Sequence, residues 1–174
     1  MKRIIIPFVL IVILAFQGVA MELLPPSIKF AKVYLTPHWI LIFLILVAGF
    51  VYPQKPMIPI IYAAVFGLMT DIVYTGVLGV YMFVIAMSLY VAQLLYRLLQ
   101  VNLLMVSVIS IISLLIVEIS LLAIYSLIGY STMPLGDFFI YRFLPTILAN
   151  ILFLIIIYLP SRRLLLWSSD GDAL

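Results

Sequence analysis

The segment "GLMTDIVYTGVLG", residues 67–79, places an aspartate in a chain that is otherwise almost continuously apolar. Asp71 follows the apolar run 57–70 and precedes the apolar run 77–96. Ionisable side chains at membrane depth are costly, and those that occur face the protein interior and bind a partner. The carboxylate of Asp71 therefore indicates a polar contact between helices. The group that binds this carboxylate determines how the helices are arranged.

The composition of the chain requires lipid as its solvent. Of 174 residues, 68% are hydrophobic and 9% are charged, and no water-soluble fold of this length has enough interior to bury that fraction. The nine lysine and arginine residues are dispersed along the chain, so they form no patch that could bind nucleic acid. In a membrane protein, an excess of basic over acidic residues usually reflects the topology of the chain. The absence of cysteine excludes disulfides, thiolate catalysis and cysteine-ligated metals.

Six apolar segments predict an all-α polytopic membrane protein with a single integral domain over residues 1–174. The predicted transmembrane helices cover about residues 4–21, 38–52, 57–70, 77–96, 101–128 and 138–159, and a short cytoplasmic tail follows at 160–174. The outer loop after the first helix contains several prolines, and we expect a short interfacial helix in it near residues 28–34.

Two of these assignments have alternatives. The first segment has Lys2 and Arg3 before it and small residues near its end, as a cleavable signal peptide would. We interpret it as a retained span because further spans follow and no exported domain does. The second and third segments are short and are separated only by "PQKP", residues 53–56. We interpret them as a tight hairpin of two short spans, and a re-entrant pair is the alternative.

The distribution of basic residues predicts that both termini are cytoplasmic. With the N-terminus inside, the inner ends of the spans carry Lys2, Arg3, Lys55, Arg97, Arg162 and Arg163, whereas the outer ends carry Lys29, Lys32 and Arg142. This asymmetry agrees with the positive-inside rule. We interpret Arg97 as an anchor at the inner interface, and His38 and Trp39 as residues of the outer interface. A single histidine provides no metal site.

No arrangement of residues indicates catalysis. The sequence contains no phosphate-binding loop, metalloprotease motif or nucleophile elbow. No histidine is placed to activate the serines of the fifth span, which are Ser107, Ser110, Ser113 and Ser120. Hydroxyl groups in membrane helices more often bind their own backbone or a neighbouring helix. We therefore predict that the protein is not an enzyme and holds neither a cofactor nor a metal ion.

The few polar residues inside the predicted spans follow helical spacing. Two sets share one helical face each: Ala63, Gly67 and Asp71 on the third span, and Arg142, Thr146 and Asn150 on the sixth. The two small residues of the first set allow another helix to approach closely, and the carboxylate ends that face. Pro145 is expected to bend the sixth span beside the second set.

The depth of the charged residues suggests how they pair. Asp71 and Arg142 both lie near the outer ends of their spans, which favours an ion pair between them. Glu118, on the fifth span, lies on the order of 15 Å below the outer end and could meet Thr146 or Asn150, or bind Arg142 instead. We interpret these contacts as structural rather than as a path for protons or a substrate, because such paths usually carry more ionisable groups.

The segment "GLMTDIVYTGVLGVYMF", residues 67–83, resembles the hallmark segment of the rod-shape-determining MreD family. The motif consists of Gly67, Asp71 and Gly79, with one glycine four residues before the aspartate and the other eight residues after it. By layout, the resemblance covers most of the chain, because MreD proteins are bacterial inner-membrane proteins of about this length without an extramembrane domain. It implies a bundle similar to the substrate-binding subunits of energy-coupling-factor transporters.

The resemblance also implies a function. MreD proteins belong to the machinery that builds cell wall along rod-shaped bacteria. They bind MreC, a single-span protein with an extracytoplasmic coiled coil, and connect through it with MreB, the RodA glycosyltransferase and a class B penicillin-binding transpeptidase. We therefore expect a scaffold in the bacterial cytoplasmic membrane that binds MreC within the bilayer, through the face of Ala63, Gly67 and Asp71 and the region of Glu118.

The same resemblance supplies an alternative function. The chain could be a small-molecule-binding membrane subunit of an energy-coupling-factor type transporter. Such a subunit needs a solvent-reachable pocket with several polar groups, whereas the outer loops of this sequence offer few polar side chains.

Overall fold

The computed structural model describes residues 4–22, 33–130 and 133–169, and every regular element in this part of the chain is helical. The elements are α1 (Ile5–Glu22), α3 (Trp39–Phe50), α4 (Met57–Thr70), η2 (Asp71–Thr75), α5 (Val80–Tyr96), α6 (Leu103–Leu127), α7 (Leu135–Asp137), η3 (Phe138–Phe143) and α8 (Leu144–Ser169). η2 and η3 are short π-helical turns. The prediction of an all-α fold is confirmed. Most of the interfacial helix predicted near 28–34 lies outside the described residues.

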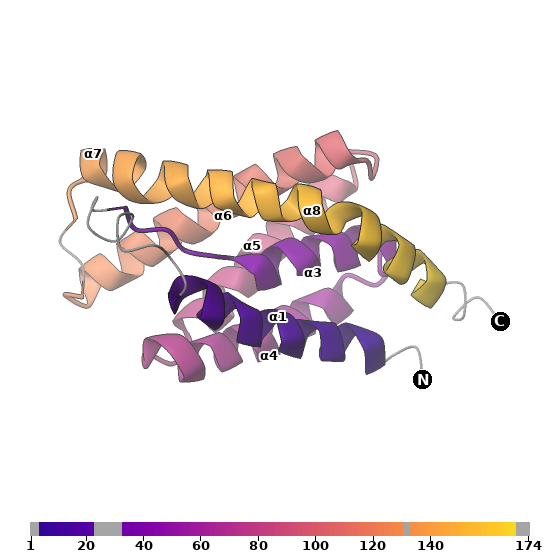
Figure 1. The fold of residues 1–174 in the computed structure, drawn as a ribbon, viewed down its shortest axis with the longest axis horizontal. Coiled ribbons are helices and arrows are strands. Elements are labelled where there is room, and N and C mark those ends of the chain that lie inside the picture. The colour runs from indigo at the N-terminus through magenta and orange to yellow at the C-terminus, as the bar shows by residue number, and fades with distance from the viewer. Residues whose placement is uncertain (1–3, 23–32, 131–132, 170–174) are drawn as a thin grey trace.

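The helices lie side by side along the long axis of the molecule, and the start of α1 and the end of α8 lie at the same end (Figure 1). Following the predicted topology, we refer to that end as the inner end and to the opposite one as the outer end. In the described part of the chain, three helical stretches are long and apolar enough to cross a membrane: Met57–Thr75, Leu103–Leu127 and Leu135–Trp167. α1, α3 and α5 are shorter apolar helices. Each of the six predicted segments therefore contains one helix.

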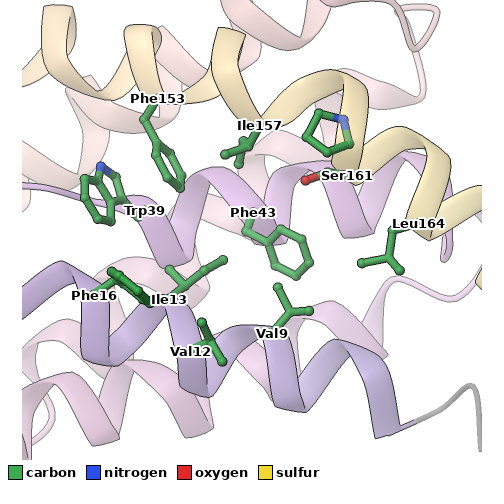
Figure 2. A pocket seen from close by; sticks show the side chains of 11 residues that line it. Val9, Val12, Ile13, Phe16, Trp39, Phe43, Phe153, Ile157, Ser161 and Leu164 are labelled. Carbon is green, nitrogen blue, oxygen red and sulfur yellow. The ribbon is translucent and has the colours of Figure 1, made fainter.

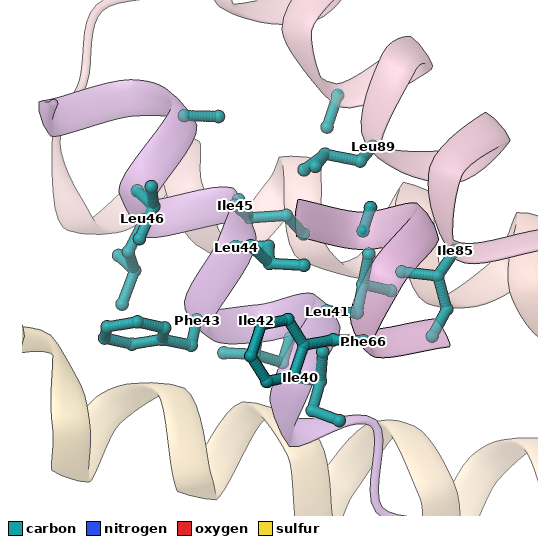
Figure 3. Close-up of a cluster of buried hydrophobic side chains, with 14 of the residues drawn as sticks. Ile40, Leu41, Ile42, Phe43, Leu44, Ile45, Leu46, Phe66, Ile85 and Leu89 are labelled. Carbon is teal, nitrogen blue, oxygen red and sulfur yellow. The ribbon is translucent and has the colours of Figure 1, made fainter. Parts of the chain in front are cut away.

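Helix α3 forms the centre of the bundle. Residues 40–49 are all buried, and the helix packs against α1, α4, α5, α6 and α8. Figure 3 shows its side chains among those of its neighbours, which include Phe66 of α4 and Leu89 of α5. Because a helix that is apolar on all sides is stable in a fold only when it is surrounded, this sequence of isoleucines and leucines accounts for its central position.

A short extended segment, residues 33–38, leads into α3 from the outer end (Figure 1). The 12 residues of α3 span only about 18 Å at ~1.5 Å per residue, which is less than the ~30 Å of a bilayer core. The extended segment continues along the bundle, and its last two residues, Pro37 and His38, are buried. Backbone that is not helical at this depth must find its hydrogen-bond partners within the protein.

Helix α8 differs from the predicted sixth span at both ends. It continues through Pro160 to Ser169, so the first ten residues of the predicted tail, 160–169, are helical. At the outer end it continues directly from η3. At Pro145, where the sequence predicts a bend, the winding has just changed from π-helical to α-helical.

Candidate functional site

Asp71 caps helix α5 across the turn that joins α4 to α5. Its Oδ2 accepts hydrogen bonds from the backbone N–H groups of Gly79 at 2.9 Å and Met82 at 3.2 Å, and its Oδ1 accepts one from Tyr81 at 2.9 Å. The first N–H groups of a helix have no partner within it, and a carboxylate there also interacts favourably with the helix dipole. The fully buried Asp71 therefore holds together the two helices that flank its own turn.

The two glycines of the motif serve the same turn. Gly79 precedes the first residue of α5 with φ of 92°, a conformation that favours glycine. Gly67 lies against the first turn of α5, where a Cβ atom would come within 2.7 Å of the Met82 Cα and 2.8 Å of the Tyr81 carbonyl oxygen. Ala63, one turn before Gly67, is fully buried. The predicted face of small residues thus packs inside the protein, where α4 meets α5.

Replacing Gly67 with alanine is expected to force α4 and α5 apart. The added methyl group would press on backbone atoms, which cannot rotate away, and overpacking of this kind costs about 1–3 kcal/mol. Thermal unfolding in detergent would measure the loss. Gly136→Ala is the matched control, because a Cβ atom at that helical glycine meets nothing within 4 Å. Equal unfolding temperatures for the two variants would contradict the close approach at Gly67.

Glu118 of α6 is the centre of a second polar cluster. Its Oε1 lies 2.7 Å from His38 Nε2, and its Oε2 accepts a hydrogen bond from Arg142 Nε at 2.7 Å. The side chains of Glu118 and His38 are 0% and 1% exposed, and that of Arg142 is 25% exposed. A buried carboxylate needs a charged or hydrogen-bonding partner for each oxygen, and Glu118 has one on each side.

These contacts correct two interpretations of the sequence. The ion pair favoured between Asp71 and Arg142 is wrong: Arg142 binds Glu118, while backbone N–H groups satisfy Asp71. His38 is not an interfacial residue, because it is buried beside Glu118. Its neighbour Trp39 stacks on Phe153 of α8, with ring centroids 4.5 Å apart.

The polar face of η3 and α8 supplies hydrogen bonds to the extended segment. The bonds run in the same order along both stretches: Tyr34 N–H to the Tyr141 carbonyl at 2.8 Å, Thr36 N–H to Thr146 Oγ1 at 3.1 Å, Asn150 Nδ2 to the Thr36 carbonyl at 2.9 Å, and His38 N–H to Asn150 Oδ1 at 2.7 Å. Two side chains and one carbonyl of a helix thus replace the neighbouring strand that an extended backbone would otherwise need.

Pro145 contributes to this arrangement through the hydrogen bond that it cannot make. Proline has no N–H to donate to the carbonyl four residues earlier, which here is that of Tyr141 in η3. That carbonyl accepts the N–H of Tyr34 instead. The proline, Thr146 and Asn150 therefore serve one purpose, which is to dock the segment that carries His38 to Glu118.

A cavity of about 750 Å³ lies beside both clusters at the outer end. Its polar lining consists of neutral side chains from α1, the extended segment and the turn of Asp71: Gln17, Thr36, Thr70, Tyr74, Thr75 and Tyr81. Gln17 is 7% exposed, and its Oε1 has no hydrogen-bond partner among the described residues. A buried carbonyl oxygen without a partner is costly, and Gln17 is one of the residues that line this cavity.

A smaller groove of about 340 Å³ lies between α1, α3 and α8. Figure 2 shows its lining of apolar side chains, among them Phe16, Trp39, Phe43 and Phe153. Such a surface accommodates acyl chains or apolar side chains by shape, but it offers almost no polar group that could recognise a particular ligand.

The geometry offers no catalytic or metal centre within the described residues. No three histidine or acidic residues there gather as a metal site would require. Of the serines of α6, Ser107 donates to the carbonyl of Leu103 in its own helix, whereas the buried hydroxyls of Ser110 and Ser113 have no hydrogen-bond partner among the described residues. The hydrogen bonds of Asp71, Glu118, Thr146 and Asn150 described above join these residues to one another's elements or to the backbone.

Sequence reasoning missed three residues that the structure places at the site. His38 binds Glu118, Tyr81 lies beside His38 with ring centroids 6.2 Å apart, and Gln17 faces the outer cavity. A signal for Gln17 exists in the sequence, since it is the one strongly polar side chain within the apolar run 4–21. Tyr81 and His38 carry no comparable signal, because aromatic and polar residues at the ends of spans are usually interfacial.

The fold and these two clusters define an all-α membrane protein whose buried polar residues organise its own bundle. The chain belongs to the MreD family: the model of the rod shape-determining protein MreD family matches residues 2–167. The chain is also 32% identical over 162 residues to the rod shape-determining protein MreD of Bacillus subtilis (strain 168), which covers 93% of this chain and 92% of that protein. No solved structure matches the chain, so the expected likeness to energy-coupling-factor subunits stays a prediction.

Proposed function

We propose that this protein is a non-enzymatic scaffold of the cell-wall elongation complex in the bacterial cytoplasmic membrane. Membership of a family that is named for rod-shape determination supports a role in cell shape. We further propose that it binds MreC directly. Through MreC it connects indirectly with MreB and supports lateral peptidoglycan synthesis by RodA and a class B penicillin-binding transpeptidase. The polar residues of the bundle, which are engaged in structural contacts rather than in a reactive centre, support a scaffold over an enzyme.

The surface expected from the sequence to bind MreC is occupied within the protein itself. Ala63, Gly67 and Asp71 are buried against α5, and Glu118 is enclosed between His38 and Arg142. A partner helix could reach these residues only by separating α4 from α5 or α6 from α8. We therefore place the contact with MreC at the outer cavity.

The single observation that carries this placement is the unpartnered Oε1 of Gln17 in the outer cavity. A peptide segment supplies a backbone N–H for that oxygen, and the neutral hydroxyl groups around it can bind further backbone groups. A single-span partner with an extracytoplasmic domain necessarily passes the outer end of the bundle between its span and that domain. The segment of MreC that leaves the bilayer is the part that we propose enters the cavity.

Replacing Gln17 with leucine is expected to reduce the amount of MreC that co-purifies with the protein. Loss of one buried hydrogen bond at the interface lowers affinity roughly two- to tenfold, while leucine retains the apolar packing of α1. Quantitative pull-down of MreC from membranes in which the chain is co-expressed with its own MreC would measure the effect.

The matched control for this experiment is Gln93→Leu. Gln93 is also a buried glutamine with an unpartnered Oε1, but it lies at the inner end of the bundle. Capture of MreC should be unchanged in this control. Full capture by Gln17→Leu, with an unfolding temperature equal to that of the parent, would overturn the placement of MreC in the outer cavity.

The outer cavity also favours a second candidate function, that of a small-molecule-binding subunit of a transporter. Its volume of about 750 Å³ is within the range of ligand pockets, and its neutral polar groups suit an uncharged polar molecule. Mass spectrometry of protein purified without MreC distinguishes the two functions. A small molecule that co-purifies with the parent and is lost from Gln17→Leu, with MreC capture unaffected, would replace the scaffold proposal.

A further inference from the structure

A second polar cavity lies at the inner end of the bundle, and it shares no lining residue with the outer cavity. It has a volume of about 270 Å³ and lies between the ends of α3 and α5 and the turn before α4. Gln93, Tyr96 and Arg97 of α5 contribute polar groups to its lining. Arg97 is exposed and forms no ion pair with another described residue, and Lys55 is exposed on the adjoining turn.

Two of the residues that line this cavity each carry a buried polar atom without a partner among the described residues. These atoms are the Oε1 of Gln93 and the hydroxyl of Tyr96. Gln93 is 9% exposed, and its Nε2 donates to the carbonyl of Pro56 at 3.0 Å, which fixes the amide and leaves its oxygen free. Tyr96 packs on Gly49, where a Cβ atom would lie 3.2 Å from the hydroxyl, so this glycine provides room for the ring.

We propose that this inner cavity binds the headgroup of an anionic phospholipid that carries free hydroxyl groups, the chemistry of phosphatidylglycerol. The guanidinium of Arg97 suits a phosphodiester. The oxygen of Gln93 requires a donor, which a glycerol hydroxyl supplies, and the hydroxyl of Tyr96 can either donate to the phosphate or accept from the glycerol. An anion without hydroxyl groups would satisfy Arg97 but leave the Gln93 oxygen unpaired.

The position of the cavity favours a lipid as the source of this headgroup. The cavity lies where two apolar helices end, next to the basic residues Lys55 and Arg97, which is the level of the headgroups when α3 and α5 lie in the bilayer. A soluble glycerol phosphate has the same chemistry and is the other source that the experiment must separate. This site is independent of the outer cavity and of the binding of MreC.

The experiment measures lipid retention by native mass spectrometry. Purified protein is exchanged in turn into nanodiscs of phosphatidylglycerol, phosphatidate or phosphatidylethanolamine, each diluted in phosphatidylcholine, and released into detergent. The parent protein should retain phosphatidylglycerol best. Arg97→Gln should lower that retention roughly two- to fivefold. Gln93→Leu should abolish the preference for phosphatidylglycerol over phosphatidate, which lacks the glycerol hydroxyls.

Tyr96→Phe distinguishes binding from a role in folding. Because the Tyr96 hydroxyl has no partner in the described part of the protein, its removal should leave the unfolding temperature in lipid-free detergent unchanged or raise it. The increase in unfolding temperature on adding phosphatidylglycerol should nevertheless be smaller than for the parent. Arg162→Gln, at an exposed arginine of α8 at the same end, is the control and should behave as the parent does.

Three results would overturn the proposal. The first is equal retention of all three lipids by the parent, which would mean that water alone fills the cavity. The second is an equal loss for Arg97→Gln and Arg162→Gln, which would indicate general attraction of anionic lipid to basic residues. The third is release of the bound phosphatidylglycerol by millimolar soluble glycerol phosphate with no dependence on acyl chains, which would assign the site to a soluble phosphate ester.

Discussion

Asp71→Ala is expected to destabilise the protein more than any other single substitution in the turn between α4 and α5. The change removes the acceptor of three backbone N–H groups at the start of α5. Each buried N–H that loses its partner costs about 1–3 kcal/mol, and the favourable charge at the helix terminus is lost as well. Gly79 and Met82 are only partly buried, so water can replace part of the lost hydrogen bonding. We therefore expect the free energy of unfolding to fall by on the order of 3–5 kcal/mol. Unfolding by a denaturing detergent, followed through tryptophan fluorescence, measures it.

Two further variants test whether the cap is the cause. Asp71→Asn retains one carbonyl oxygen but presents an NH₂ group to the remaining N–H groups. The stability of this variant should therefore lie between that of the parent and that of Asp71→Ala. Asp137→Ala removes an exposed carboxylate that makes no side-chain hydrogen bond at the start of η3, and it should behave as the parent does. An Asp71→Ala variant as stable as Asp137→Ala would mean that the cap contributes nothing in the membrane protein.

The sequence predicts the helices of this fold well because lipid leaves the chain few alternatives. Apolar runs of sufficient length in a membrane must be helical to satisfy their own backbone, so each run contains a helix near its predicted position. It also identifies the face of Ala63, Gly67 and Asp71 as a place of close helix contact. The sequence could not identify what binds Asp71, because its three shortest hydrogen bonds come from backbone N–H groups, which every residue except proline carries. Only Gly79, with a conformation that favours glycine, marks where that backbone lies.

The extended segment 33–38 could not be predicted for a related reason. A short run with a proline and a threonine ahead of an apolar helix has the composition of an interfacial loop, and the position of His38 beside Trp39 predicts an interfacial residue. The segment enters the bundle because η3 and α8 offer it matching acceptors and donors, at Tyr141 of η3 and at Thr146 and Asn150 of α8. These residues are more than a hundred positions away in the chain, and spacing alone indicates only that they share a face. Once the segment is inside, His38 reaches Glu118.

The pairing of Glu118 with Arg142 leads to a prediction that separates the two polar clusters. Glu118→Gln should lower the free energy of unfolding by on the order of 3 kcal/mol, because breaking a buried ion pair from one side is strongly destabilising. The change removes the countercharge of Arg142 and an acceptor of His38. Arg142→Gln should be defective too, since it leaves Glu118 buried with His38 as its one remaining partner among the described residues. The same unfolding measurement applies to both variants.

The double variants decide which residues are coupled. Glu118→Gln combined with Arg142→Gln should be milder than the sum of the two losses, by on the order of 1–3 kcal/mol, because each single change already removes the shared interaction. Asp71→Ala combined with Arg142→Gln should instead be additive to within roughly 0.5 kcal/mol, since these side chains share no hydrogen-bond partner. The opposite pattern would mean that Arg142 serves Asp71 in the membrane. The turn of α4 and α5 and the docking of the extended segment would then be one coupled unit, and a partner bound in the outer cavity between them would act on both at once.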